Sequence, residues 1–238
     1  MKSLFAVCML LSAFFFTSPT LTAQSNPKLT GAWSLEQDNI THLLLFTNQH
    51  FSYTVYNIPQ KKFIHTHGGS WKETGNSIST IIEFHTADKS LVGKPGVYSV
   101  KLQDKTLTSN WSGQEKTWKQ LDNGGGELNA TWRITGRDQN GQMNNIPASA
   151  RKTIKIMTGT RFQWAAINTG TGEFFGTGGG TYTFKDGRYT EFIEFFSRDS
   201  SRVGMQLSFE GKVEGKDWHH RGKSSKGDPI YEIWSKED

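Results

Sequence analysis

Hydrophobic and polar residues alternate along most of the chain in short runs with a period of two, the pattern of strands with one buried face. Clear runs are His50-Phe-Ser-Tyr-Thr-Val-Tyr56 and Arg161-Phe-Gln-Trp-Ala-Ala-Ile167, which are rich in aromatic and β-branched residues. Gly, Asn and Asp turns separate the runs, and Asp186-Gly187 is a hairpin signal. In the first half the pattern predicts one helical turn within 87–93 and strands near 31–37, 42–47, 50–57, 63–73, 77–86, 97–103, 106–112 and 115–120.

The second half of the chain repeats the first. From residue 46 to about 107, adding 111 to a residue number leads to a chemically similar residue. The offset is 99 before this block and 116 after it, so the second copy gains about twelve residues around 138–147 and five around 224–229. Such gap-free similarity indicates an internal duplication. Equivalent pairs include Trp33 and Trp132, Phe51 and Phe162, Glu83 and Glu194, and Trp118 and Trp234.

The duplication predicts two domains, 28–122 and 127–238, joined by a Gly-rich linker at 123–126 that is typical of a flexible joint. About eight short antiparallel strands in fewer than a hundred residues favour a small up-and-down β-barrel, because a closed barrel leaves no open strand edge. The predicted fold class is therefore all-β, with two tandem barrels. A β-sandwich is the alternative.

The N-terminus has the layout of a signal peptide. Lys2 is followed by an apolar stretch from Leu4 to Phe16, and Leu21-Thr22-Ala23 ends in small residues, which predicts cleavage after Ala23 and a secreted or periplasmic protein. A membrane anchor is the alternative, but the apolar stretch is shorter than the roughly 20 residues that a spanning helix needs. We therefore expect no stable membrane anchor.

Composition indicates how the two domains are stabilised and which partners they lack. The only cysteine, Cys8, lies in the predicted signal peptide, so packing must stabilise the mature domains without disulfides. Eight Trp, six Tyr and the twelve Phe that follow the predicted signal peptide supply large apolar side chains for that packing. The formal charge is +5, the basic excess is shared by both halves, and we expect no nucleic-acid partner. All eight arginines nevertheless lie in the second half.

The opening Gly31-Ala-Trp33 resembles the Gly-x-Trp opening of the lipocalin superfamily. The second copy is similar to a lipocalin-like (calycin-type) family of uncharacterised secreted bacterial domains, in the segments Lys155–Trp164, Gly178–Tyr182, Tyr189–Phe195 and Tyr231–Trp234. The resemblance implies tandem barrels and, by analogy alone, a bound ligand.

Two features depart from the lipocalin pattern. The second copy opens Ala130-Thr-Trp132, without the glycine, and neither closing strand carries the arginine that packs over the opening Trp in lipocalins. Lys119 or Lys236 would replace that arginine only in part, because a lysine lacks the planar guanidinium.

Polar residues within apolar strands are the candidate site residues. Glu83 and Glu194 either point into their barrels to bind a ligand or point outward into cross-strand ion pairs. Glu191 and His220 have the counterparts Thr80 and Ser109, so the second copy is the better candidate for a functional pocket. Ordinary barrel filling is the alternative role for each residue of the predicted ligand-binding set, which is Arg161, Trp164, Tyr182, Glu191, Glu194, Trp218 and His220.

Three functions remain open. The first is a non-enzymatic binding protein that holds a small apolar or amphipathic molecule, or a sugar, in the second barrel. The second is an isomerase, cyclase or lyase in which Glu191 or Glu194 acts with His220 as an acid–base pair. The third is a structural or interaction module with exposed aromatic residues. His65 and His67 share a strand face, but two ligands do not make a metal site, so no metal or other cofactor is predicted. Oligomeric state is left open.

Overall fold

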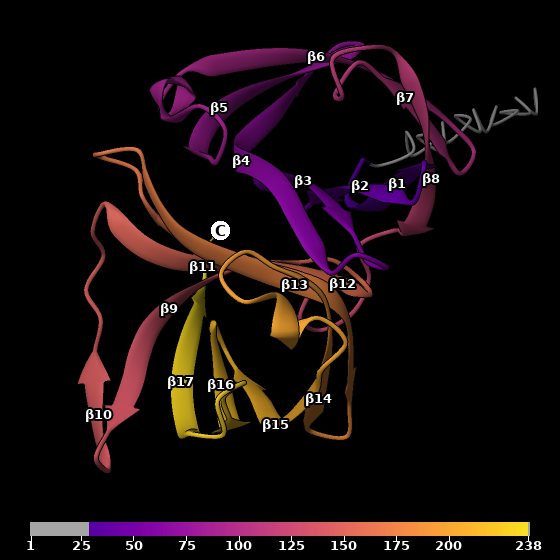
Figure 1. Ribbon diagram of the computed structural model, residues 1–238. Coiled ribbons are helices and arrows are strands. Elements are labelled where there is room, and N and C mark those ends of the chain that lie inside the picture. Colours follow the sequence, from indigo (N-terminus) through magenta and orange to yellow (C-terminus); the bar gives the residue numbers. More distant parts are fainter. Residues whose placement is uncertain (1–28, 238) are drawn as a thin grey trace, which may run out of the picture.

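The computed structural model describes residues 29–237, and the predicted signal peptide lies outside this range. The described chain forms two closed antiparallel β-barrels of eight strands in tandem, which confirms the predicted fold class (Figure 1). Each strand pairs with the next along the chain, and the last pairs with the first.

Barrel 1 closes where β1 pairs with β8, and Trp33 lies opposite Gln120 at this seam. Its strands are β1 (Gly31–Gln37), β2 (Ile40–Phe46), β3 (His50–Asn57), β4 (Lys62–Thr74), β5 (Ser77–His85), β6 (Pro95–Gln103), β7 (Thr106–Ser109) and β8 (Lys116–Asp122).

Barrel 2 closes where β9 pairs with β17, and Ile134 lies opposite Trp234. Its strands are β9 (Ala130–Gln139), β11 (Arg151–Met157), β12 (Arg161–Asn168), β13 (Glu173–Lys185), β14 (Arg188–Phe196), β15 (Gln206–Glu214), β16 (Asp217–Lys223) and β17 (Pro229–Lys236), with the extra strand β10 (Gln142–Asn145) on β9.

The twelve-residue insertion changes how barrel 2 begins. In barrel 1, β1 and β2 pair along their whole length, from Gly31 opposite Phe46 to Gln37 opposite Ile40. In barrel 2, β11 pairs with β9 only as far as Arg133, while the outer half of β9 pairs with β10. The strands β9 and β11 consequently diverge, as the left side of Figure 1 shows.

Helical structure within residues 29–237 consists of two short 3-10 turns at equivalent places, η1 (Lys89–Leu91) and η2 (Ser200–Arg202). The first lies inside the predicted turn at 87–93. Asp88 and Asp199 cap the two turns identically, each accepting a hydrogen bond from the backbone N–H two residues on. No helix in this part of the chain is long and apolar enough to span a bilayer.

The tryptophans that the two copies share are structural. Trp33 and Trp132 are both 1% exposed, and each indole N–H donates to the carbonyl four residues earlier at 2.9 Å. Lys236 Nζ lies 6.0 Å from the centroid of the Trp132 ring, in the role expected for a partial substitute of the lipocalin arginine. These contacts fix the opening strand of each barrel to its core.

The barrels pack directly against each other through a third hydrophobic cluster, distinct from the two barrel cores. Figure 1 shows β11, β12 and β13 lying beneath barrel 1. At the centre, the buried Gln163 amide accepts a hydrogen bond from Thr54 at 2.7 Å and donates one to Thr66 at 3.0 Å. The linker therefore joins two barrels that are packed together through a buried interface. The cluster contains Ala32, Leu43, Leu45, Tyr56, Phe84, Ile154, Ile156, Ala165, Ile167 and Phe195.

Candidate functional site

Barrel 1 is filled by its own aromatic side chains. Trp111 follows β7 and is 3% exposed. Its ring stacks on Tyr98 at 3.9 Å and meets Phe46 and Phe51 edge-on at 5.4 and 4.9 Å. The indole N–H donates to His67 Nε2 at 3.2 Å. Trp111 thus acts as a plug in the interior of the first barrel.

Barrel 2 lacks this plug. The residue equivalent to Trp111 is Gly222, which lies opposite Phe209 just as Trp111 meets Tyr98. Barrel 2 instead contains a cavity of about 350 Å³. Phe209, whose ring lies against Gly222, lines this cavity, whereas Gly222 does not. A cavity of this size accommodates a small organic molecule.

A buried ion pair lies on the cavity wall. Lys155 Nζ donates to Glu191 Oε1 at 2.9 Å, and the two side chains are 5% and 7% exposed. The Tyr189 hydroxyl donates to the same oxygen at 2.9 Å. The rings of Tyr189, Trp218 and Trp234 lie 5.0–5.2 Å from the ammonium group, which adds cation–π attraction.

This ion pair replaces two uncharged residues of barrel 1. The counterparts of Lys155 and Glu191 are Leu44 and Thr80. Burying one of the two charges alone would be costly, because it would leave an uncompensated charge in the interior. The two substitutions therefore belong together and represent a polar feature that only the second copy possesses.

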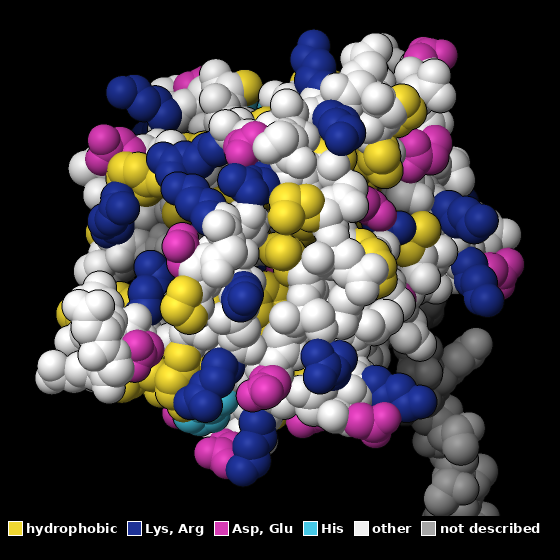
Figure 2. All heavy atoms as spheres, turned by 60° about the horizontal axis from the view of Figure 1, so that its bottom comes forward, with side chains coloured by type: hydrophobic (Ala, Val, Ile, Leu, Met, Phe, Trp, Pro, Cys, Tyr) yellow, Lys and Arg dark blue, Asp and Glu magenta, His cyan; other side chains and the backbone are white. Residues whose placement is uncertain are grey.

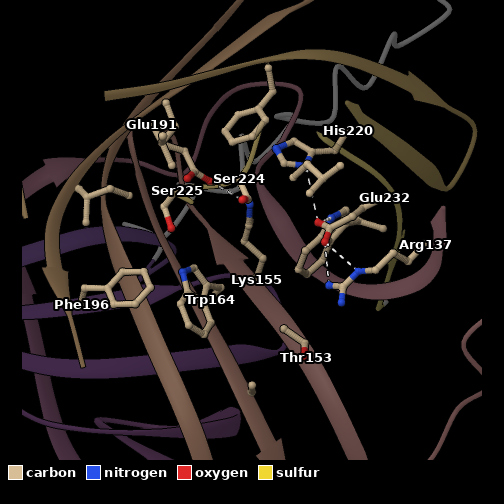
Figure 3. A pocket seen from close by; sticks show the side chains of 16 residues that line it. Arg137, Thr153, Lys155, Trp164, Glu191, Phe196, His220, Ser224, Ser225 and Glu232 are labelled. Atoms are coloured by element: carbon tan, nitrogen blue, oxygen red, sulfur yellow. Dashed lines mark hydrogen bonds and ion pairs between the residues drawn. The ribbon is translucent and has the colours of Figure 1, made fainter. Parts of the chain in front are cut away.

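His220 is the second polar group of the cavity. It is 3% exposed and packs between Phe209, Trp218 and Tyr189, with the Phe209 ring centroid 4.1 Å away. Nε2 has no hydrogen-bond partner among the described protein atoms, whereas Nδ1 faces Glu232 Oε2 at 3.6 Å (Figure 3). Burial lowers the pKa of His220 against the opposing effect of the nearby Glu232 carboxylate, so the ring is neutral at pH 7.

Glu232 and Arg137 complete the polar wall. Arg137 donates two hydrogen bonds to Glu232 Oε1, at 2.7 and 3.2 Å, and Trp234 Nε1 donates to Oε2 at 3.0 Å. Burial on its own would raise the pKa of Glu232, but neighbouring His220, Arg137 and Lys155 outweigh it and lower that pKa to about 2. Because the Arg137 side chain is 50% exposed, this end of the cavity reaches solvent.

The opposite wall is apolar. Figure 3 shows Trp164 and Phe196 facing the polar residues across the cavity, with Lys155 between them and the pair of Glu232 and Arg137. Further apolar lining comes from Ala166, Ile193, Leu207, Phe209 and Ile230. A neutral imidazole and two ion pairs on one side, and aromatic and aliphatic groups on the other, make the cavity amphipathic.

The structure brings together three of the predicted site residues. Trp164, Glu191 and His220 all line the cavity. Trp218 is fully buried behind them against Lys155 and His220, and Tyr182 is a core residue whose hydroxyl donates to the Thr158 carbonyl. Ligand binding by these residues stays a prediction.

Arg161 and Glu194 lie elsewhere, on the outer face of barrel 2. Arg161 donates to Glu194 Oε2 at 2.6 Å, and Tyr56 of barrel 1 donates to the same oxygen at 2.7 Å. Glu83 is arranged similarly, 3.7 Å from His50 and 3.0 Å from Lys152 of barrel 2. Both glutamates thus point outward into ion pairs, the second of the two alternatives. Of the two acid–base pairs considered, only Glu191 and His220 share the cavity.

Sequence reasoning missed Lys155, Glu232 and Arg137. The signal for the first two was present, because Lys155 replaces Leu44 and Glu232 replaces Lys116 at equivalent positions. The comparison that selected Glu191 and His220 would have selected them too. Arg137 lies at the edge of the insertion, where no reliable counterpart exists.

Comparison with known proteins adds no relative: neither a protein-family model nor a curated protein matches the chain. The fold itself is a lipocalin-like barrel present twice, an architecture compatible with binding a small molecule.

Proposed function

We propose that the protein binds a small amphipathic molecule in the cavity of barrel 2. The observation that carries this proposal is the difference between equivalent interiors, since Trp111 fills barrel 1 whereas barrel 2, which has a glycine at the equivalent position, contains a cavity of about 350 Å³. Barrel 1 serves as a partner that covers one side of barrel 2.

The Nε2 atom of His220, which has no partner among the described residues, indicates where the polar part of the ligand lies. A buried polar group without a partner costs about 1–3 kcal/mol, so a structure that keeps one is poised to gain by binding. A neutral imidazole offers one donor and one acceptor. With Nδ1 facing the Glu232 carboxylate at 3.6 Å, Nε2 is the acceptor, and a ligand hydroxyl can donate to it. The apolar part of the ligand then lies against Trp164 and Phe196 (Figure 3).

Calorimetric titration with 1-octanol tests the proposal, because this probe combines one hydroxyl with an apolar chain. We expect one binding site per chain. Ala166→Trp places an indole in the cavity and weakens binding at least about tenfold through steric exclusion. Thr183→Trp, which adds the same side chain at an exposed position of β13, is the matched control and leaves binding unchanged.

A wild-type chain that does not bind octanol, or an Ala166→Trp variant that binds it as well as wild type, contradicts the proposal. Thermal melting of both variants verifies folding. Native mass spectrometry of the freshly purified protein adds an independent readout, because a ligand retained from the source appears as extra mass.

We further propose that the protein is exported, with cleavage after Ala23, and that it belongs to the secreted lipocalin-like domains that its second copy resembles. The apolar stretch from Leu4 to Phe16 supports export, and the tandem barrels support the resemblance. The mass of the mature protein tests the cleavage site: a chain that begins at Gln24 is expected.

A further inference from the structure

A second hollow lies beside the cavity, where β9 and β11 diverge. This side cleft has a volume of about 280 Å³, and its lining includes Ile146 and Pro147 from the insertion. Arg137, Thr153 and Ala166 line both the side cleft and the cavity, so the two hollows meet at the barrel wall. A ligand that occupies both hollows would have to pass these three residues.

The lining of the side cleft is strongly basic. Four cationic side chains and no carboxylate contribute to it among the described residues. In Figure 2 Lys and Arg side chains gather on the left of the viewed face. Two of the cations, Arg133 and Lys152, lie 3.1 and 3.6 Å from the Glu237 carboxylate behind the cleft. The cations are Arg133, Arg137, Arg151 and Lys152.

Arg151 differs from the other three cations. Its guanidinium lies 3.8 Å from the centroid of the Phe175 ring, and no carboxylate of the described chain pairs with it. Stacking uses the face of the guanidinium and leaves the N–H groups at its edge available. Such an edge binds a carboxylate or phosphate through two parallel hydrogen bonds.

The basic character is specific to the second copy. The counterparts of Arg133, Arg151 and Lys152 in barrel 1 are Ser34, Ile40 and Thr41, which are all neutral. Three of the eight arginines that distinguish the second half of the chain thus line one cleft. These arginines lie beside the twelve-residue insertion, the longer of the two insertions in the second copy. The insertion and the arginines thus distinguish the same side of barrel 2 from barrel 1.

We propose that the side cleft is an anion subsite and that the ligand is an anionic amphiphile. Its carboxylate or phosphate group binds at Arg151, and its apolar part occupies the cavity of barrel 2. This inference rests on the proposed function, because it names the chemical class of the molecule that the cavity holds.

Three probes with the same chain length test the inference: octanoate, octyl phosphate and 1-octanol, each titrated calorimetrically into the full chain. We expect at least one of the two anions to bind about tenfold more tightly than octanol, since a bidentate charged pair adds to the same apolar contacts. Whichever anion binds more tightly identifies the head group. The preference over octanol should weaken as salt is raised, because the cleft is open to solvent.

Arg151→Gln removes the charge and is expected to abolish the preference for the anion while octanol binding stays unchanged. Arg188→Gln is the matched control, because Arg188 is exposed on β14 and contacts Ser208 rather than the cleft. Octanol binding by Arg151→Gln also shows that the variant is folded.

The outcomes separate the two proposals. Equal affinity of wild type for octanol and both anions, or an anion preference that survives in Arg151→Gln, overturns the anion subsite and leaves the proposed function standing. Absence of binding by all three probes overturns both.

Discussion

The two barrels have the same strand order and the same buried tryptophans, yet their interiors differ in kind. The interior of barrel 1 is packed with aromatic side chains around Trp111, whereas barrel 2 has a cavity with Lys155, Glu191 and His220 on its wall. Residues that are chemically alike in the two copies stabilise the barrel frame, meaning its strands and buried tryptophans. Residues that differ between the copies form the candidate site. A duplicated fold therefore contains its own control for separating stability from function.

Removing the plug of barrel 1 should have the largest effect on this comparison. Trp111→Ala deletes a side chain that packs on Tyr98, Phe46 and Phe51, and it should lower the free energy of unfolding by about 4 kcal/mol through loss of packing. Urea denaturation followed by fluorescence measures this change. Octanol binding to barrel 2 should be retained, and its loss would show that barrel 1 contributes to the site.

Breaking the buried ion pair of barrel 2 should cost about 3 kcal/mol. Lys155→Met keeps the aliphatic stem but leaves the Glu191 carboxylate buried without a cation. The double variant Lys155→Met with Glu191→Gln should recover most of the stability, because the Gln carbonyl still accepts from Tyr189. Urea denaturation of both variants measures these changes. If the double variant is as unstable as the single one, lost packing rather than the unpaired charge accounts for the loss of stability.

Acid should destabilise the protein, and His67 of barrel 1 provides a specific test. Burial, reinforced by His85 and His65, lowers the pKa of His67 from 6.5 to about 3. Between these values the unfolded chain binds a proton that the folded chain does not, so stability is complete above pH 6.5 and declines as the pH falls below it. The decline from pH 7 to 5 should be about 2 kcal/mol for this residue.

His67→Gln removes the titrating group while its carbonyl can still accept from Trp111. Urea denaturation at pH 7, 6 and 5 should therefore show a shallower decline for the variant than for wild type. Parallel curves would mean that His67 does not contribute to the acid sensitivity.

The smallest expected effect on stability comes from His220. His220→Phe removes the buried Nε2, which has no partner among the described residues, while Arg137 and Trp234 still donate to the Glu232 carboxylate. The change should raise the free energy of unfolding by about 1 kcal/mol. The same change should weaken octanol binding about tenfold, because the hydroxyl loses its partner. A gain in stability together with a loss of binding is the signature of a site residue. Loss of both would assign His220 to the frame of barrel 2.

Much of the architecture could be predicted from local patterns. The strands, the helical turn and the barrel closure follow from alternation with period two and from the need to cover strand edges. The sequence alone left open whether Glu83 and Glu194 point inward or outward. Glu194 is the extra residue of a β-bulge, since Ile193 and Phe195 lie opposite the consecutive residues Gly180 and Gly179. Ile193 therefore packs in barrel 2 and Phe195 against barrel 1, so alternation with a period of two does not hold at this point.

The sequence by itself determined the duplication, the strand number and the positions at which the copies differ, since all three depend on neighbouring residues or on a constant offset along the chain. Only the tertiary structure decided that Lys155 meets Glu191, that Trp111 is a plug with Gly222 as its counterpart, and that the outer face of β12 is buried in an interface. A period of two states which residues share a face, but which face lies inside depends on distant strands closing around it.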